Sequence, residues 1–150
     1  MPDVIQFYAP SGRYGCLSNH SPHPIELKDR TWPTSEHYFQ AQKFPGTAHE
    51  EVIRLEPSST VAAEMGRDRS KPLRADWNAV KDDLMREAVR AKFEQHADLR
   101  AILLATGDAT IVEHTGNDAY WGDGGDGSGR NMLGKILMEV RTQLRTINPV

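Results

Sequence analysis

A helical stripe near the C-terminus constrains the fold most. Apolar residues recur there at spacings of three and four: Leu133, Ile136, Leu137, Val140 and Leu144. That period is typical of an amphipathic helix with one face buried against the rest of the domain. Only this helix follows the glycine-rich stretch 117–131, so the stretch is predicted to be a loop within a domain and not a linker between two. With 150 residues and no internal repeat, we expect a single domain over residues 1–150.

Five further helices are predicted from capping residues and helix breakers. They are expected over residues 36–44, 47–56, 58–66, 77–96 and 98–105. The expected caps are Thr34 or Ser35 for the first, a Thr47–Glu50 capping box for the second, Asp76 for the longest and Asp98 for the last. The longest helix is also expected to carry an exposed Asp82–Arg86 pair.

Strand signals are few and short. Val4 to Ala9 is an apolar-rich run, PIELKDRTWP reads as a small hairpin, and Ile111–Val112 suggests one more short strand. These segments are too scattered for a parallel βαβ core. The sequence therefore predicts a mainly α fold with a few short β-strands.

Composition narrows the class of protein. The formal net charge is −3 and the pI is about 6.1, so the chain lacks the basic footprint of a nucleic-acid-binding protein. Cys16 is the single cysteine, which excludes an internal disulfide and a cysteine-rich zinc site and favours a small buried hydrophobe. No apolar run reaches the roughly 18 residues of a membrane span, and no secretory signal is apparent. We expect a cytoplasmic protein with no membrane partner.

The segment WPTSEHYFQAQKF is the first candidate for chemistry. On a helix, Glu36, Gln40 and Lys43 share one face, while Phe39 and residues 41–42 are expected to point elsewhere. Such a face is often simply solvated. It could also carry out acid–base chemistry, with the lysine available to attack an aldehyde-like carbon.

The segment GRDRSKPLRADW is the second candidate. Its cations, Arg67, Arg69, Lys71 and Arg74, either form an exposed basic loop or converge on a phosphate, which arginine binds through two parallel hydrogen bonds. Trp77 follows at a helix start. It is either an anchor of the core or a platform for a flat heterocycle.

The loop NDAYWGDGGDGSGRN is the third candidate. Its spacing does not fit a calcium-binding EF-hand, and the GxxxxGK[ST] phosphate loop is absent. Gly125 to Gly129 could still bring backbone N–H groups close to a phosphate before the last helix. The histidines are scattered and form no ligand pattern, so no metal is predicted.

Three long motifs together resemble the NADAR, or YbiA-like, superfamily. They are WPTSEHYFQAQKF, MGRDRSKPLRADW and NDAYWGDGGDGSGRNMLG, and the similarity runs from about Phe7 to Leu144. The resemblance implies an orthogonal, mainly helical domain that hydrolyses an N-glycosidic bond without a cofactor. The implied substrates are early riboflavin intermediates, the phosphoribosylamino-pyrimidines, which such an enzyme would remove as damaging metabolites. Relatives that act on ADP-ribosylated guanine, or that bind NAD or ADP-ribose without turnover, provide the alternatives.

The resemblance also implies roles for four residues. It puts the catalytic carboxylate at Glu36, with Trp77 and Asp118 in the same site. Lys43 falls where a Schiff-base lysine has been suggested for the guanine-directed branch. We expect Glu36 either to activate water or to protonate the leaving amine, and Asp118 to bind ribose hydroxyls or to stabilise the cationic sugar, in the manner of two-carboxylate glycosidases.

The remaining site residues are expected to bind the substrate. Arg67 and Arg69, helped by Lys71, would hold the 5-phosphate, and Trp77 and Trp121 would enclose the pyrimidine. Further contacts are expected from Asn19, Tyr38, Gln40, Tyr120, Asp123 and Asn131.

Two segments depart from the family pattern. LSNHSPHPI lacks the aromatic residues that relatives often have near Leu17 and His20, and the hairpin turn reads Lys28-Asp29-Arg30 where Asp-Gly is usual. Reaction class is therefore better determined than substrate choice.

Overall fold

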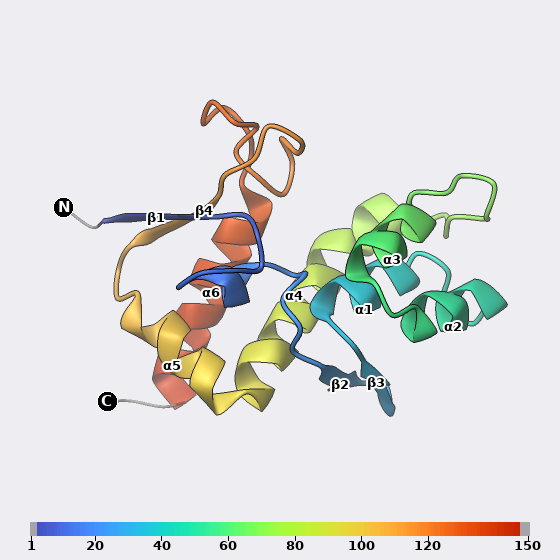
Figure 1. Cartoon of the computed structure of the whole chain (residues 1–150), viewed down its shortest axis with the longest axis horizontal. Coiled ribbons are helices and arrows are strands. Elements are labelled where there is room, and N and C mark those ends of the chain that lie inside the picture. Colours follow the sequence, from blue (N-terminus) through green and yellow to red (C-terminus); the bar gives the residue numbers. More distant parts are fainter. Residues whose placement is uncertain (1–2, 148–150) are drawn as a thin grey trace.

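The computed structural model describes residues 3–147, and helices dominate them (Figure 1). The helices are α1 (Ser35–Ala41), α2 (Ala48–Leu55), α3 (Ser59–Gly66), α4 (Trp77–Gln95), α5 (Ala97–Ala105) and α6 (Met132–Ile147). The strands are β1 (Val4–Phe7), β2 (Ile25–Leu27), β3 (Arg30–Trp32) and β4 (Thr110–Glu113), with a single 3-10 turn at Gly15–Leu17. The predicted fold class, mainly α with a few short strands, is confirmed.

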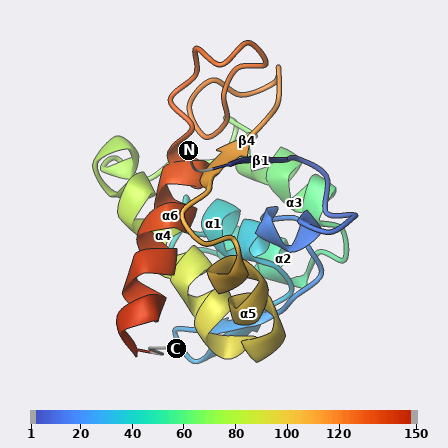
Figure 2. The same cartoon turned by 90° about the vertical axis from the view of Figure 1, so that its left-hand side faces the viewer.

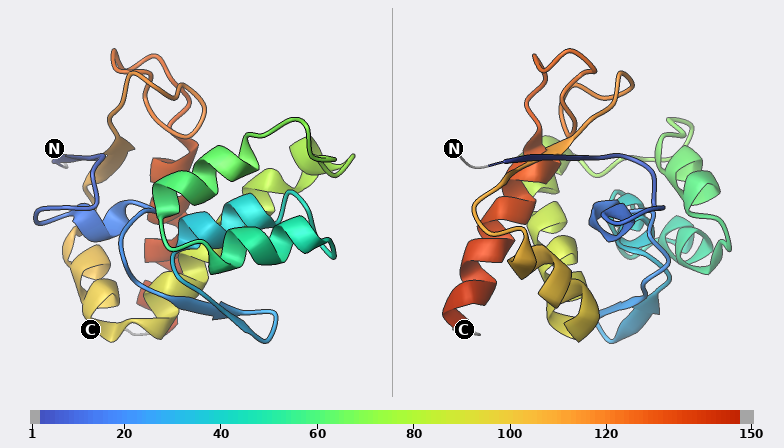
Figure 3. Two further views of the ribbon diagram at one scale, coloured as in Figure 1. Left: turned by 45° about the vertical axis from the view of Figure 1, so that its right-hand side comes forward. Right: turned by 60° about the vertical axis from the view of Figure 1, so that its left-hand side comes forward.

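Helix α4 is the central element. It lies between α1, α2 and α3 on one side and α5 and α6 on the other (Figure 1), and the first three lie side by side in the left view of Figure 3. Its residues Met85, Val89 and Phe93 belong to one apolar cluster together with α5 and α6. Its Ala88 and Ala91 belong to a second cluster together with α1 and the β2–β3 hairpin. One helix thus joins the two parts of the core.

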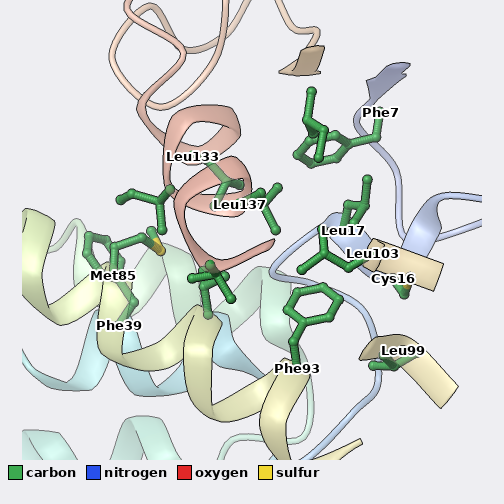
Figure 4. Packing of buried hydrophobic residues seen from close by; sticks show 14 of the residues in the cluster. Phe7, Cys16, Leu17, Phe39, Met85, Phe93, Leu99, Leu103, Leu133 and Leu137 are labelled. Carbon is green, nitrogen blue, oxygen red and sulfur yellow. The ribbon is translucent and has the colours of Figure 1, made fainter. Parts of the chain in front are cut away.

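The C-terminal stripe is buried as predicted. All five of its apolar residues are exposed by 1% or less. Figure 4 shows Leu133 and Leu137 of α6 in the same cluster as Met85 and Phe93 of α4. Cys16 is also buried in this cluster, and burial raises the pKa of its thiol, in keeping with the prediction of a small buried hydrophobe.

The two strand pairs have different roles. β1 pairs with β4 in parallel, from Val4 with Thr110 to Phe7 with Glu113, so the end of β1 lies beside the entry to the glycine-rich loop (Figure 2). β4 is longer than the predicted strand and ends at Glu113. β2 and β3 form the predicted hairpin, whose turn residues Lys28 and Asp29 have φ values of 55° and 61°. This left-handed conformation explains why Asp-Gly suits the turn better.

Gly134 and Asn131 hold the start of α6 against β4. A Cβ atom at Gly134 would come within 2.1 Å of the carbonyl oxygen of Ile111, so only glycine allows this approach. Asn131 has a φ of 52°, and its amide donates to the Ile111 carbonyl at 2.9 Å. Its side-chain oxygen accepts from the N–H of Glu113, also at 2.9 Å. The end of the 117–131 loop is therefore fixed to the end of β4.

The cap of α1 is confirmed, but the predicted capping box is wrong. Thr34, and not Ser35, caps α1, because its hydroxyl accepts from the N–H of His37 at 3.1 Å. Thr47 makes no cap bond. Its hydroxyl donates to a carbonyl of the preceding turn, and the Glu50 carboxylate accepts from the residue before Thr47. The side chains of Thr47 and Glu50 therefore bind the turn that follows α1 and are not available to cap α2.

The caps predicted for α4 and α5 are also wrong. Asp76 makes no side-chain cap bond, because its carboxylate pairs with the guanidinium of Arg74, two residues earlier. Helix α5 begins at Ala97, so Asp98 lies inside its first turn. A nearby cation and a short inter-helix connection outweigh the local capping preference in these two places.

The exposed Asp82–Arg86 pair predicted on α4 is not formed, because each of the two residues has other partners. Arg86 pairs with Asp83 and with Glu139 of α6. Asp82 instead accepts a hydrogen bond from the hydroxyl of Tyr120 at 2.5 Å. That bond attaches the 117–131 loop to α4. In residues 3–147 no helix is long and apolar enough to cross a membrane.

Candidate active site

A cleft of about 880 Å³ lies where α1, the start of α3 and the first turns of α4 meet β4 and the 117–131 loop. Several predicted site residues line it: Asn19, Glu36, Gln40, Lys43, Arg67, Trp77, Asp118, Tyr120 and Trp121. Three carboxyl side chains face this one space, from Glu36, Glu113 and Asp118. In the described part of the chain, no group of three or more His, Cys, Asp or Glu side chains is arranged to hold a metal ion.

Helix α1 supplies one wall of the cleft. Glu36, Gln40 and Lys43 share the cleft-facing side, as their spacing predicts, so the solvated-face interpretation is wrong. The expectation that Phe39 points elsewhere is also wrong. Phe39 lines the cleft, with its ring 5.1 Å from the ring of Trp77 and 5.2 Å from that of Trp121. A residue three positions after Glu36 falls on the same helical face.

Glu36 is buried within a polar chain. One carboxylate oxygen accepts from the Gln40 amide at 2.7 Å, and the other lies 3.9 Å from Nε2 of His20. Nδ1 of His20 in turn lies 2.8 Å from the hydroxyl of Ser59. The backbone N–H of Glu36 donates to the carbonyl of Asn19, which fixes the start of α1 against the early loop. Sequence reasoning missed His20, because its loop departs from the family pattern and gives no helical or strand signal.

Lys43 is buried near Trp77. Its amine donates to the carbonyl of Gly66 at 3.2 Å and lies 5.5 Å from the centre of the Trp77 ring. Burial first, and then the charge of Arg69, lower the pKa of Lys43 to about 8. A larger fraction of this amine is therefore unprotonated near neutral pH than for an exposed lysine, which is what a nucleophilic lysine requires.

Aromatic rings form a continuous wall of the cleft. Tyr120 and Trp121 have ring centres 4.9 Å apart, and Trp121 continues through Phe39 to Trp77. Lys81 of α4 also lines the cleft, with its amine 4.0 Å from the centre of the Tyr120 ring. Sequence reasoning missed Lys81 because a lysine on an amphipathic helix normally indicates only its exposed side.

Asp118 is oriented by its own loop. Its Oδ1 atom accepts from the backbone N–H groups of Tyr120 and Trp121, each at 2.9 Å. In the described residues its Oδ2 atom has no hydrogen-bond partner. The loop backbone therefore holds one oxygen and leaves the other for a ligand.

Glu113 is the third carboxyl group of the cleft, and sequence reasoning missed it. The predicted strand stopped at Val112, one residue earlier, and a single glutamate at a strand end carries no motif. Burial first, and then the charges of Asp118, Glu36 and Asp123, raise the pKa of Glu113 to about 7. Strand β4 therefore ends in a carboxyl group that holds its proton to much higher pH than an exposed glutamate.

Three residues predicted to bind substrate lie outside the cleft lining because they have structural partners. Tyr38 is fully buried, stacks edge-on against Trp32 and donates to Glu87.

Asp123 accepts from the His114 ring and from the N–H groups of Thr115 and Gly125. These bonds, led by the His114 contact, lower the pKa of Asp123 to about 2. Asn131 bridges β4 and α6.

Arg69 and Lys71 also lie outside the cleft lining. The Arg69 guanidinium donates to the Gly66 carbonyl at 3.1 Å, and the side chain is otherwise exposed. Lys71 follows in the same loop, and only Arg67 of this basic segment lines the cleft. Charge density in the sequence indicated the loop but not which side chain points inward.

Comparison with known proteins gives consistent matches over nearly the whole chain. The family model described as NADAR domain matches residues 6–145. N-glycosidase YbiA of Escherichia coli (strain K12) is 62% identical over 141 residues, covering 94% of this chain and 88% of that protein. Riboflavin biosynthesis protein VVA0006 of Vibrio vulnificus (strain YJ016) is 43% identical, covering 99% of this chain but 41% of that protein. The NMR structure of E. coli YbiA superposes with a TM-score of 0.91 at 59% identity, covering 98% of this chain and 88% of that one.

Proposed function

This chain belongs to the NADAR domain family and is an N-glycosidase, and from that premise we propose that its substrates are the phosphoribosylamino-pyrimidines of early riboflavin biosynthesis. Hydrolysis would release ribose 5-phosphate and the aminopyrimidine. The observation that carries the proposal is a single cleft of about 880 Å³ with carboxyl groups, aromatic rings and cations on its walls. Its volume lies in the usual range for small-molecule sites. The similarity to a riboflavin biosynthesis protein supports the substrate class.

The phosphate end of the substrate fits the cations of the cleft. Arg67 lines the cleft, and its guanidinium makes no hydrogen bond within residues 3–147. Lys81 lines the same cleft from α4. We propose Arg67 as the phosphate contact in place of Arg69 and Lys71, which lie outside the lining, whereas the Lys81 amine lies over the Tyr120 ring of the aromatic wall. Arginine is suited to this role because two of its N–H groups can bind one phosphate.

The pyrimidine end fits the aromatic wall. Trp77 and Trp121 both contact Phe39, so the three rings form a supported platform for a flat heterocycle. Tyr120 extends the platform toward Lys81. A sugar placed between this platform and Arg67 would lie near the carboxyl groups of the cleft.

Glu36 and Asp118 are proposed to handle the sugar. Asp118 has one oxygen fixed by the loop backbone, so the other can bind a ribose hydroxyl or face the cationic sugar of the transition state. Glu36, held by Gln40 and near His20, can take a proton from the attacking water. Lys43 offers a second route, in which its amine attacks C1′ of the ring-opened imine, the C1′–N bond to the aminopyrimidine breaks and the amine leaves with a proton. Water then hydrolyses the resulting Schiff base to ribose 5-phosphate and the free lysine.

ADP-ribosylated guanine is the second candidate substrate. The position of Lys43 in the cleft supports it, because the resemblance to the family puts the Schiff-base lysine suggested for the guanine-directed branch at this residue. The overall charge of −3 weighs against a DNA substrate, since DNA phosphates bind basic surfaces.

Product identification tests the proposal. The protein is incubated separately with a phosphoribosylamino-pyrimidine and with ADP-ribosylated guanosine, and the released sugar is identified by mass spectrometry. We expect ribose 5-phosphate, at a rate that Glu36→Gln lowers by roughly 10²- to 10⁴-fold. Release of ADP-ribose alone would reject the riboflavin substrate. Borohydride added during turnover distinguishes the two routes, since an adduct on Lys43 requires the Schiff base.

A further inference from the structure

Glu113 is placed for a role that neither Glu36 nor Asp118 fills. Three contacts hold its backbone: the Asn131 side chain accepts its N–H, its carbonyl accepts from the N–H of Asp123, and β1 pairs alongside it. Its side chain lines the cleft beside Asp118. A carboxyl group carried by a fixed backbone position at the wall of a cleft is suited to a proton transfer that requires a defined geometry.

Glu113 also differs from the other two carboxyl groups in its partners. Glu36 accepts a hydrogen bond from Gln40, and Asp118 accepts two from its loop. The Glu113 carboxyl group has no hydrogen-bond or ion-pair partner within residues 3–147. A carboxyl group without donors, partly buried and near other carboxylates, is stabilised in its neutral form.

We infer that Glu113 is the general acid, which protonates the departing nitrogen when the N-glycosidic bond breaks, while Glu36 and Asp118 act as carboxylates. The inference rests on the cleft being the catalytic site, as proposed above, but not on which N-glycoside is hydrolysed. The pKa of about 7 agrees with this role, because an acid with a pKa near the working pH is both protonated and able to donate.

The step balances as a hydrolysis. The C1′–N bond breaks, its electron pair goes to nitrogen, and nitrogen takes the proton of Glu113. Water then adds its oxygen to C1′ and gives a proton to Glu36. Glu113 is left as a carboxylate and Glu36 as an acid, and the proton returns to Glu113 through solvent. The net reaction consumes one water and forms one sugar hydroxyl and one amine.

The charges around Glu113 come from several elements. Asp118 and Asp123 face it from the loop and Glu36 from α1, and all three favour its neutral form. The other ionisable groups of the cleft are His20, Lys43 after α1, Arg67 after α3, Lys81 from α4, Tyr8 and Tyr120. Because the raised pKa of Glu113, about 7, lies close to the lowered pKa of Lys43, about 8, the acid must be identified by a measurement other than the pH profile of the wild type.

The test therefore compares leaving groups. Glu113→Gln keeps the shape of the side chain and removes its proton. We expect the rate on an N-glycoside substrate to fall roughly 10²- to 10⁴-fold. On 4-nitrophenyl riboside 5-phosphate, whose leaving group departs without protonation, the fall should be less than about tenfold. An equal fall on both substrates, or no fall on the N-glycoside, overturns the inference.

Two controls keep the result interpretable. Glu64→Gln changes an exposed glutamate of α3 outside the cleft lining and should leave both rates unchanged. Carboxyl ¹³C NMR of glutamate-labelled wild-type protein should show one group with a midpoint near pH 7 that disappears in Glu113→Gln. If Glu113→Gln does not fold, Glu113→Asp replaces it. The rate of Glu113→Asp should then fall more on the N-glycoside than on 4-nitrophenyl riboside 5-phosphate, and an equal fall on both substrates counts against the inference.

If the wild type cleaves only ADP-ribosylated guanosine, the riboflavin substrate is rejected, and the same comparison on that N-glycoside still tests Glu113.

Discussion

Gly66 sets the distance between α3 and the cleft-facing side of α1, so Gly66→Ala tests how tightly the proposed site is packed. A Cβ atom at this position would lie 1.9 Å from Oε1 of Gln40, 2.7 Å from its Cδ and 2.9 Å from its Cβ. The Gly66 carbonyl also accepts from Lys43 and Arg69, which restricts how far the backbone can shift. The new methyl group must therefore displace Gln40.

The displacement acts on Glu36. Moving Oε1 from 1.9 Å to an ordinary contact of about 3.4 Å requires the amide to shift by about 1.5 Å, which breaks the 2.7 Å bond from Gln40 to Glu36. A misplacement of about 1 Å in a catalytic site can cost about 10²-fold in rate. For stability, alanine gains about 1 kcal/mol in helix propensity over glycine, while overpacking costs about 1–3 kcal/mol. We expect kcat to fall about 10- to 100-fold, with stability reduced by no more than about 2 kcal/mol.

Steady-state kinetics and urea unfolding measure both effects on one preparation. Gly116→Ala is the matched control, because a Cβ atom there meets nothing within 4 Å and Gly116 does not line the cleft. The control should keep its kcat within about twofold. If Gly66→Ala kept full activity and became more stable by the helix-propensity gain alone, the packing of α3 against Gln40 would not position Glu36.

Two further predictions use pH to isolate single groups. Asp123→Asn should lower the Tm at pH 7, because the folded state depresses the pKa of Asp123 to about 2. In thermal unfolding, the difference in Tm from wild type should shrink as the pH falls from about 4 to 2. A difference in Tm that does not depend on pH would contradict the His114 contact as its source. Lys92 is buried with a pKa of about 7 and donates to the Ser18 carbonyl at 2.8 Å. Between pH 7 and 10 the unfolded chain holds the Lys92 proton and the folded chain does not. As the pH rises through this range, the free energy of urea unfolding of wild type should therefore increase relative to that of Lys92→Met, by at most about 5 kcal/mol. If it does not increase, Lys92 keeps its charge in the folded state.

Periodicity predicted the helices well because it depends on burial, which the whole fold enforces. The stripe from Leu133 to Leu144 is buried along its length. Capping was less predictable, because a capping side chain has competing partners that the sequence does not reveal. Asp76 pairs with Arg74, and Thr47 donates to the preceding turn. These contacts arise from local chain geometry, which capping preferences do not include.

The cleft residues predicted from the sequence lie mainly on one helical face or in one motif. Glu36, Gln40 and Lys43 could be placed together because α1 has a fixed period. Asp123 and Arg69 share motifs with cleft residues, but lie outside the lining. A motif identifies a segment that matters, and only packing decides which of its side chains support the fold and which face a ligand.

Glu113 could not be found by either route, and the reason bears on how the site works. Three carboxyl groups facing one cleft cannot all be charged at equal cost, because each repels the others. Glu36 and Asp118 have N–H donors that stabilise a carboxylate, whereas Glu113 has none within residues 3–147. These differences favour the neutral form of the group at the end of β4, whose pKa is raised to about 7. That difference depends on contacts made by α1 and by the 117–131 loop, which lie far from Glu113 in sequence, so the division between acid and carboxylates is a property of the fold.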